Sequence, residues 1–151
     1  MPQVQFYHLT ATPLERAVPK LIEKAYGAGF RVHAVLASEE QAEMMNQLLW
    51  TFDPGSFVPH GGPKDPNAAE QPVFISATPE APNAPDLLFV TEGSAPADPG
   101  SYRRILDLFD GKNEAAVNAA RERWQRYKAA GCELSYWQQT ESGGWQQKAV
   151  A

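Results

Sequence analysis

Apolar runs alternate with amphipathic stretches along the first third of the chain. Residues 4–9 are rich in β-branched and aromatic side chains and predict a strand. Residues 14–27 carry apolar side chains at helical spacing, and Pro19 is expected to bend this helix near its start. Residues 30–37 and 42–52 repeat the pattern of a strand followed by a helix. Two such units in succession favour parallel strands joined by right-handed crossovers.

Two segments carry the residue pattern of a capping box. Residues 12–15 place Thr12 before Pro13, so we expect Thr12 to cap the first helix. Residues 38–41 place Ser38 three positions before Gln41 and predict the start of the second helix.

The middle of the chain is divided by proline and glycine. Residues 53–72 predict a long loop, and residues 92–100 predict another. Residues 73–76 and 87–90 are short apolar runs typical of strands buried on both faces. Residues 102–109 could form a strand or a short helix, and the strand is favoured because Asp-Gly follows directly.

Residues 113–131 form the longest amphipathic stretch, with Asn113 as its expected N-cap and Gly131 as its stop. One face carries Ala116, Val117, Ala120, Trp124 and Tyr127. After this helix an extended piece near Tyr136 precedes residues 138–151, which predict a flexible tail. The whole chain, residues 1–151, therefore predicts a single Rossmann-like α/β domain: a mostly parallel open sheet flanked by helices.

The same helix has a cationic border. Arg121, Trp124 and Lys128 follow one another at spacings of three and four residues. A groove beside this border would accept a ligand with both apolar and anionic parts. The alternative is a core helix whose long cations extend into water, with Arg123 and Arg126 solvated.

Composition excludes several classes of protein. The 151 residues carry a net charge of −5, whereas a protein that coats nucleic acid needs a broad basic field. Cys132 is the single cysteine, so neither an intrachain disulfide nor a cysteine metal cluster is possible. No apolar run reaches the roughly 18 residues that span a bilayer, and we expect a soluble cytoplasmic protein.

No motif for catalysis or for a cofactor is present. Gly27 and Gly29 follow a helix, whereas a dinucleotide fingerprint follows a strand, and residues 61–64 lack the spacing of a phosphate loop. The three histidines have no metal spacing; His8 and His33 are expected to be structural, and His60 lies in a loop where a role is more open. We therefore expect no enzyme activity, no cofactor and no metal.

Three pieces of the sequence together resemble one known family. They are LLW.F.P.SFVPHG at residues 48–61, PVFIS at residues 72–76 and AARERW..YK.AG at residues 119–131. In this order they are similar to the chi subunit of bacterial DNA polymerase III holoenzyme. The resemblance implies a Rossmann-like, non-catalytic accessory protein of the clamp-loader assembly. It also implies two partners: the acidic C-terminal tail of single-stranded DNA-binding protein (SSB), and the psi subunit.

The resemblance implies a peptide-binding site at Trp50, Phe57 and Arg121, with Trp124 and Lys128 beside them. Our hypothesis is that Arg121 binds the terminal carboxylate of the SSB tail while Trp50 and Phe57 wall an apolar pocket. The residues alone also allow Trp50 to pack under the loop that follows it. The resemblance assigns no residues to the psi contact.

Two other functions stay open at this point. One is a small phosphate- or nucleotide-dependent α/β enzyme, which would need a ligand-binding loop after a strand. The other is a direct binder of single-stranded DNA that stacks bases on Trp50 and Trp124 beside Arg121. The acidic composition counts against the second.

Overall fold

The computed structural model describes residues 2–53, 55–91 and 99–150. They form one eight-stranded sheet of order β3-β4-β2-β5-β6-β1-β7-β8, parallel except for the antiparallel pair β7 and β8. The strands are β1 Gln3–Leu9, β2 Val32–Val35, β3 His60–Gly61, β4 Val73–Ser76, β5 Leu87–Thr91, β6 Arg104–Asp110, β7 Glu133–Gln139 and β8 Trp145–Val150. The helices are α1 Leu14–Gly27, α2 Glu39–Thr51 and α3 Glu114–Ala129, with 3-10 turns at Ala68–Glu70 and Pro99–Ser101. The predicted α/β class and the mostly parallel open sheet are confirmed.

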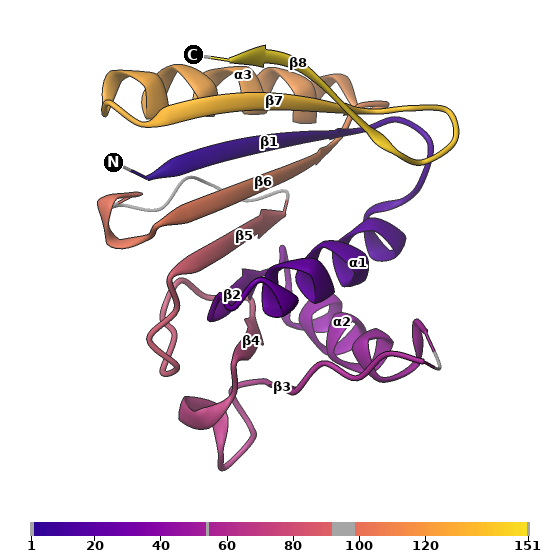
Figure 1. The fold of residues 1–151 in the computed structure, drawn as a ribbon, viewed down its shortest axis with the longest axis vertical. Coiled ribbons are helices and arrows are strands. Elements are labelled where there is room, and N and C mark those ends of the chain that lie inside the picture. The colour runs from indigo at the N-terminus through magenta and orange to yellow at the C-terminus, as the bar shows by residue number, and fades with distance from the viewer. Residues whose placement is uncertain (1, 54, 92–98, 151) are drawn as a thin grey trace.

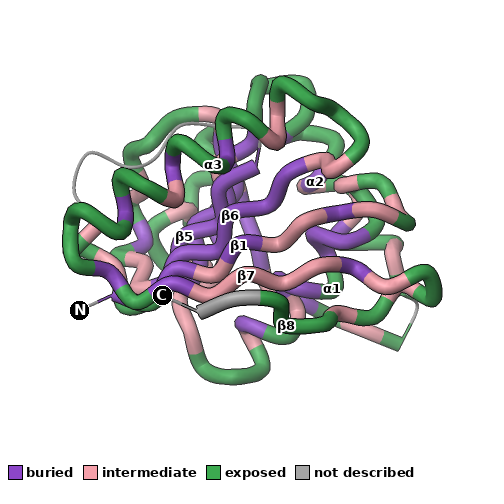
Figure 2. The backbone as a smooth tube through the Cα atoms, turned by 90° about the horizontal axis from the view of Figure 1, so that it is seen from above, coloured by how far each residue is buried: buried purple, intermediate pink, exposed green. Residues whose placement is uncertain are grey.

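The helices cover the sheet from both sides. Along β5, Leu87 and Phe89 pack into the core beneath α1 and α2, whereas Leu88 and Val90 pack into the core beneath α3. Figure 1 shows α1 and α2 in front of the sheet and α3 behind it, beside β1 and β7. The central strands are buried and the helices expose their outer faces (Figure 2). The sheet therefore separates α2 from α3.

Most of the expected helix ends are observed. The Asn113 side chain accepts a hydrogen bond from the N–H of Ala116, and the Ser38 hydroxyl accepts one from the N–H of Gln41. Gly131 ends α3 with a φ of 85°, which a residue with a side chain rarely adopts. The strand favoured for residues 102–109 is also confirmed, as β6.

The expected cap at Thr12 is wrong. Pro13 occupies the N-cap position of α1, and no side chain caps that end. The carbonyl oxygen Oε1 of Gln139 instead accepts hydrogen bonds from the backbone N–H groups of Thr10, Ala11 and Thr12, at 3.2, 2.9 and 3.0 Å. The amide nitrogen of Gln139 donates to the Thr12 hydroxyl at 2.7 Å. A side chain from the end of β7 thus fills the turn between β1 and α1, where a dinucleotide fold receives phosphate.

Two strands lie where the sequence did not predict them. The long loop of residues 53–72 contains β3, which extends the sheet beside β4. Residues 138–151 were expected to form a flexible tail, yet β8 pairs with β7 within this range. Most of the loop predicted for residues 92–100 lies outside the described residues. No helix in the described part of the chain is long and apolar enough to cross a membrane.

Candidate functional site

A cavity of about 520 Å³ lies between α3 and the carboxyl-terminal halves of β1, β6 and β7. Its lining residues are Phe6, His8, Phe109, Val117, Ala120, Arg121, Trp124, Gln125 and Tyr136. Most of them are apolar or aromatic, and no Asp or Glu of the described residues lines the cavity. Such a hollow suits a ligand that is largely apolar.

The sheet register brings the strand residues of this cavity together. Alternate side chains of a strand point to the same face, so Phe6 and His8 both face α3. His8 pairs with Phe109 across β1 and β6, and Phe6 pairs with Tyr136 across β1 and β7. Three neighbouring parallel strands thus form the floor of the cavity, and α3 forms one wall.

Trp124 joins this wall to the core. Its ring centroid lies 5.3 Å from Phe6 and 6.4 Å from Tyr136, both in edge-to-face geometry, and the side chain is half-buried. These contacts hold the indole in place from two strands. Trp124 therefore serves both packing and the cavity wall.

The two arginines of the ARER segment face in different directions. Arg121 is exposed and lines the cavity, where its guanidinium is available to an anion. Arg123 was expected to be solvated if the helix served only packing, and this expectation is wrong. Its guanidinium donates to the buried carboxylate of Asp107 at 2.6 and 2.8 Å. The pair attaches α3 to β6 directly beside the cavity.

A polar pair lies at one side of the cavity. His8 Nδ1 is hydrogen-bonded to the hydroxyl of Tyr136. Burial lowers the pKa of His8 below its ordinary value, although a hydrogen bond to the backbone of Gly111 and the charge of Asp110 oppose this. Burial raises the pKa of Tyr136, and the positive charge of Arg121 acts against that shift. Both groups are therefore neutral near pH 7.

Trp50 and Phe57 lie elsewhere, at the end of α2 and in the loop that follows. Their ring centroids are 5.9 Å apart, and they are 53% and 67% exposed. Trp50 also lies 4.5 Å from the ring of His60. We name Trp50, Phe57 and His60 the aromatic patch.

His60, whose role the sequence left open, is buried and fixed by the backbone. Its Nδ1 and Nε2 atoms lie 2.6 and 2.8 Å from the carbonyl oxygens of Val58 and Asn46. The ring supports Trp50 and joins β3 to α2. Cys132 is buried, and among the described residues no three His, Cys, Asp or Glu side chains gather as a metal site requires.

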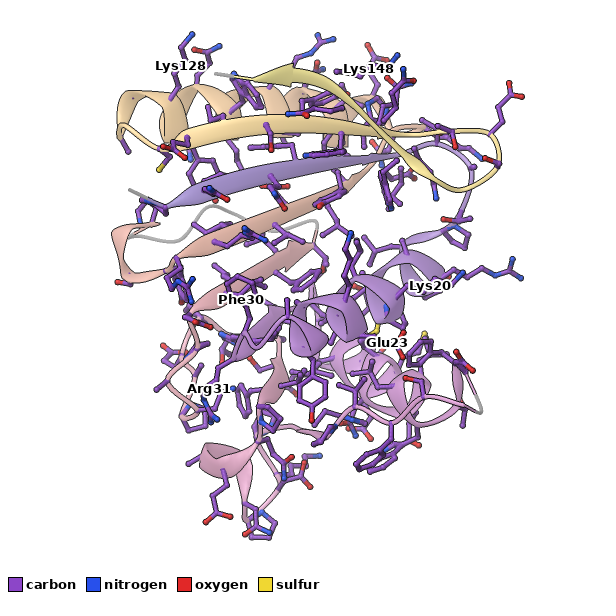
Figure 3. The ribbon with its side chains drawn as sticks, viewed as in Figure 1. Lys20, Glu23, Phe30, Arg31, Lys128 and Lys148 are labelled. Atoms are coloured by element: carbon purple, nitrogen blue, oxygen red, sulfur yellow. The ribbon has the colours of Figure 1, made fainter. Side chains whose placement is uncertain are left out.

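The structure thus divides the five predicted site residues. It brings Arg121 and Trp124 together in the cavity beneath α3, and it brings Trp50 at the end of α2 together with Phe57 in the loop that follows. It does not bring these two pairs into one pocket, because α2 and α3 cover opposite faces of the sheet. Lys128 is exposed, does not line the cavity, and extends from the last turn of α3 (Figure 3).

Sequence reasoning missed several residues of the cavity: His8, Phe109, Val117, Gln125 and Tyr136. Val117 had been placed on the apolar face of the helix, without a ligand role. A signal did exist in the strands, because each of the three strand residues lies two positions after a buried residue on the same strand. His8 follows Phe6, Phe109 follows Asp107, and Tyr136 follows Leu134. Reading that signal requires the order of the strands.

Comparison with known proteins identifies the family. A family model described as "DNA polymerase III chi subunit, HolC" matches residues 1–135. The chain belongs to the DNA polymerase III chi subunit family. The matched residues include the aromatic patch and the whole lining of the α3 cavity except Tyr136. Strand β8 also lies beyond the match.

Three relatives carry matching names. "DNA polymerase III subunit chi" of Pseudomonas aeruginosa is 30% identical over 137 residues, which are 89% of this chain and 94% of the relative. The protein of the same name from Haemophilus influenzae is 30% identical over 135 residues, 87% of this chain and 93% of the relative. "Probable DNA polymerase III subunit chi" of Rickettsia prowazekii is 34% identical over 90 residues, 60% of this chain and only 54% of the relative. Each of these names describes a chi subunit of DNA polymerase III.

Proposed function

We propose that this chi family member binds the acidic C-terminal tail of SSB in the cavity beneath α3 and, through a separate contact with psi, connects it to the clamp-loader assembly. The tail is an acidic peptide that ends in an apolar residue with a free carboxylate, as the family resemblance implies. The last side chain enters the aromatic cavity, and Arg121 binds the terminal carboxylate. The protein has no catalytic role of its own in this proposal.

The observation that carries this proposal is the exposed Arg121 beside an apolar cavity of about 520 Å³. Aromatic side chains of the strand floor and of α3 supply the apolar contact area, and one arginine supplies the charge. The protein as a whole is acidic, so an acidic peptide gains little from long-range attraction. We therefore expect local contacts with Arg121, rather than the overall field, to determine binding.

The psi contact is proposed at the aromatic patch. Trp50 and Phe57 are large apolar side chains with more than half of their surface exposed, as is Met44 of α2 at 55%. Such side chains are typical of protein interfaces. Because the sheet lies between this patch and the α3 cavity, one chain has room for both partners at once. That arrangement favours a bridging role.

The test of tail binding is a calorimetric titration with a synthetic peptide of the SSB C-terminus. We expect wild-type protein to bind the free-carboxylate peptide and to lose most of the affinity when the carboxylate is amidated. Arg121→Ala should weaken binding roughly a hundredfold, because a charged hydrogen-bond partner is lost. Arg126→Ala removes an exposed arginine of the same helix that does not line the cavity, and serves as the control. Equal affinity of Arg121→Ala and wild type would refute the site.

The test of the psi contact is co-purification with psi of the same organism. We expect Trp50→Ala with Phe57→Ala to abolish co-purification while Arg121→Ala preserves it. Preserved co-purification of the aromatic double variant would place the contact elsewhere.

The two other functions predict different results. A nucleotide-dependent enzyme requires a free loop after a strand, but Gln139 fills the turn after β1. A direct DNA binder predicts affinity for single-stranded DNA that falls steeply with salt in the absence of SSB. Titration of the purified protein with an oligonucleotide at two salt concentrations tests this second possibility.

A further inference from the structure

The His8 ring is held in a fixed position at the end of β1. A Cβ atom on Gly111 would overlap His8 Nε2, so the imidazole occupies the space that a side chain at Gly111 would need. The ring centroid is also 5.0 Å from Phe109 and 5.8 Å from Tyr136. With Nε2 against the backbone of Gly111, Nδ1 is the atom that reaches the Tyr136 hydroxyl.

The proton on His8 decides what Tyr136 can offer to a ligand. Because Nε2 is the ring nitrogen next to Gly111, we assign the hydrogen bond with the Gly111 backbone, and the proton of the neutral ring, to Nε2. Nδ1 then accepts the hydroxyl hydrogen of Tyr136. The Tyr136 oxygen then presents only lone pairs to the cavity, which repel a carboxylate. In the protonated ring Nδ1–H donates to the Tyr136 oxygen, and the hydroxyl hydrogen is released to donate into the cavity.

We propose that His8 and Tyr136 form a second binding point for the peptide carboxylate, and that the carboxylate binds together with one proton taken up from solvent by His8. The proposal rests on the proposed binding of the SSB tail in the α3 cavity. Arg121 supplies the permanent charge, and the His8–Tyr136 pair supplies a hydrogen bond that forms only when a carboxylate is present. Because an amide is uncharged, the pair also favours a free C-terminus over an internal peptide segment.

The charges around His8 are consistent with this linkage. At the end of β6, the negative charge of Asp110 favours the protonated His8 ring. On β7, Tyr136 is neutral, and the positive charge of Arg121 on α3 lowers the pKa of Tyr136 against the effect of burial. Burial opposes these effects, and the pKa of His8 in the free protein lies below its ordinary value. A bound carboxylate adds a negative charge beside the pair and raises that pKa. Binding therefore takes up a proton at pH values between the pKa of His8 in the free protein and its higher pKa in the complex.

The test is calorimetric titration of the full chain with the SSB tail peptide at pH 7.5, 6.5 and 5.5. We expect the affinity for the free-carboxylate peptide to rise roughly three- to tenfold from pH 7.5 to 5.5, since a tenfold change corresponds to a pKa shift of about one unit. At pH 6.5 the buffer supplies the proton that His8 takes up. The apparent enthalpy of binding should therefore differ between phosphate and Tris buffers, with the sign that proton uptake requires. The amidated peptide should show neither effect.

Two variants distinguish a specific role of the His8–Tyr136 pair in carboxylate binding from a general effect on packing. His8→Asn keeps a group that hydrogen-bonds Tyr136 but does not titrate, so binding should become independent of pH and of buffer. Tyr136→Phe should reduce the preference for the free carboxylate over the amide, whereas the control Tyr26→Phe, on α1, should not. Thermal unfolding checks that each variant is folded.

The possible outcomes are distinct. If wild type binds neither peptide, the proposed function itself fails. If wild type binds the free peptide but His8→Asn keeps the same pH and buffer dependence, the proton linkage is wrong while the site stands. If Tyr136→Phe keeps the full preference for the carboxylate, Tyr136 is not a binding point.

Discussion

The guanidinium of Arg123 donates two hydrogen bonds to the carboxylate of Asp107, at 2.6 and 2.8 Å, and the side chains are 8% and 0% exposed. Two positions earlier in the same helix, Arg121 is exposed beside the cavity. Two residues of an α-helix differ in direction by about 200°, so one arginine faces the sheet while the other faces the ligand space. The buried pair fixes the helix that presents Arg121.

Breaking this pair should strongly destabilise the fold. Arg123→Ala leaves the carboxylate of Asp107 buried without its partner, and we expect the free energy of unfolding to fall by about 3–5 kcal/mol. Urea denaturation measures this loss. The matched control is Arg126→Ala, because Arg126 is exposed on the same helix and should change stability by no more than about 0.5 kcal/mol. Similar small losses in both variants would show that the pair does not hold α3.

Acid should destabilise the protein through His33. This residue is fully buried in β2, its Nε2 lies 2.8 Å from the Ser76 hydroxyl, and burial lowers its pKa to about 4. Between pH 6.5 and about 4 the unfolded chain binds a proton that the folded chain excludes. Stability is therefore complete above pH 6.5 and decreases as the pH falls, by up to about 3 kcal/mol.

Urea denaturation of wild type and His33→Gln across this pH range measures the effect. Other groups also titrate here, so the informative quantity is the difference between the two proteins. We expect that difference to change with pH between 6.5 and 4 and to be constant above 6.5. A difference that is constant throughout would contradict the assignment to His33.

Gln139 should be important for the turn between β1 and α1. Gln139→Ala removes the acceptor of three backbone N–H groups, and we expect a loss of about 1–3 kcal/mol. Hydrogen exchange at the amides of Thr10, Ala11 and Thr12 should accelerate more than exchange in the rest of β1. The control is Gln146→Ala, since Gln146 is exposed on β8. Unchanged exchange at these three amides would contradict the predicted role of Gln139.

The aromatic patch should not affect tail binding. Trp50→Ala and Phe57→Ala remove side chains on the face opposite the α3 cavity, so the affinity for the SSB tail peptide should stay within about twofold of wild type. Trp124→Ala, in the cavity wall, should weaken the same binding by at least tenfold. Calorimetric titration of each variant with the tail peptide measures these affinities. Loss of peptide affinity in Trp50→Ala would restore the single pocket that the sequence suggested.

The sequence predicted features that depend on neighbours along the chain. Helices follow from the 3.6-residue period and buried strands from short continuous apolar runs. The caps at Ser38 and Asn113 depend on hydrogen bonds over three residues. The cap expected at Thr12 is absent, and the Thr12 hydroxyl instead accepts a hydrogen bond from Gln139, which is 127 residues away in sequence. Strand β8 was missed because its central residues 146–148 are all polar and carry no strand pattern, whereas in the fold the segment pairs with β7.

The candidate site shows the same difference between features local in sequence and features that depend on distant residues. By itself the sequence determined that α3 has an apolar face with Arg121 at its border, since helical spacing defines a face from one segment alone. Which residues lie opposite that face depends on strand order. Only the tertiary structure placed His8, Phe109 and Tyr136 there and put Trp50 and Phe57 on the α2 side of the sheet, away from α3. Periodicity specifies the direction of a side chain relative to its own element, whereas a binding pocket requires the relative positions of several elements.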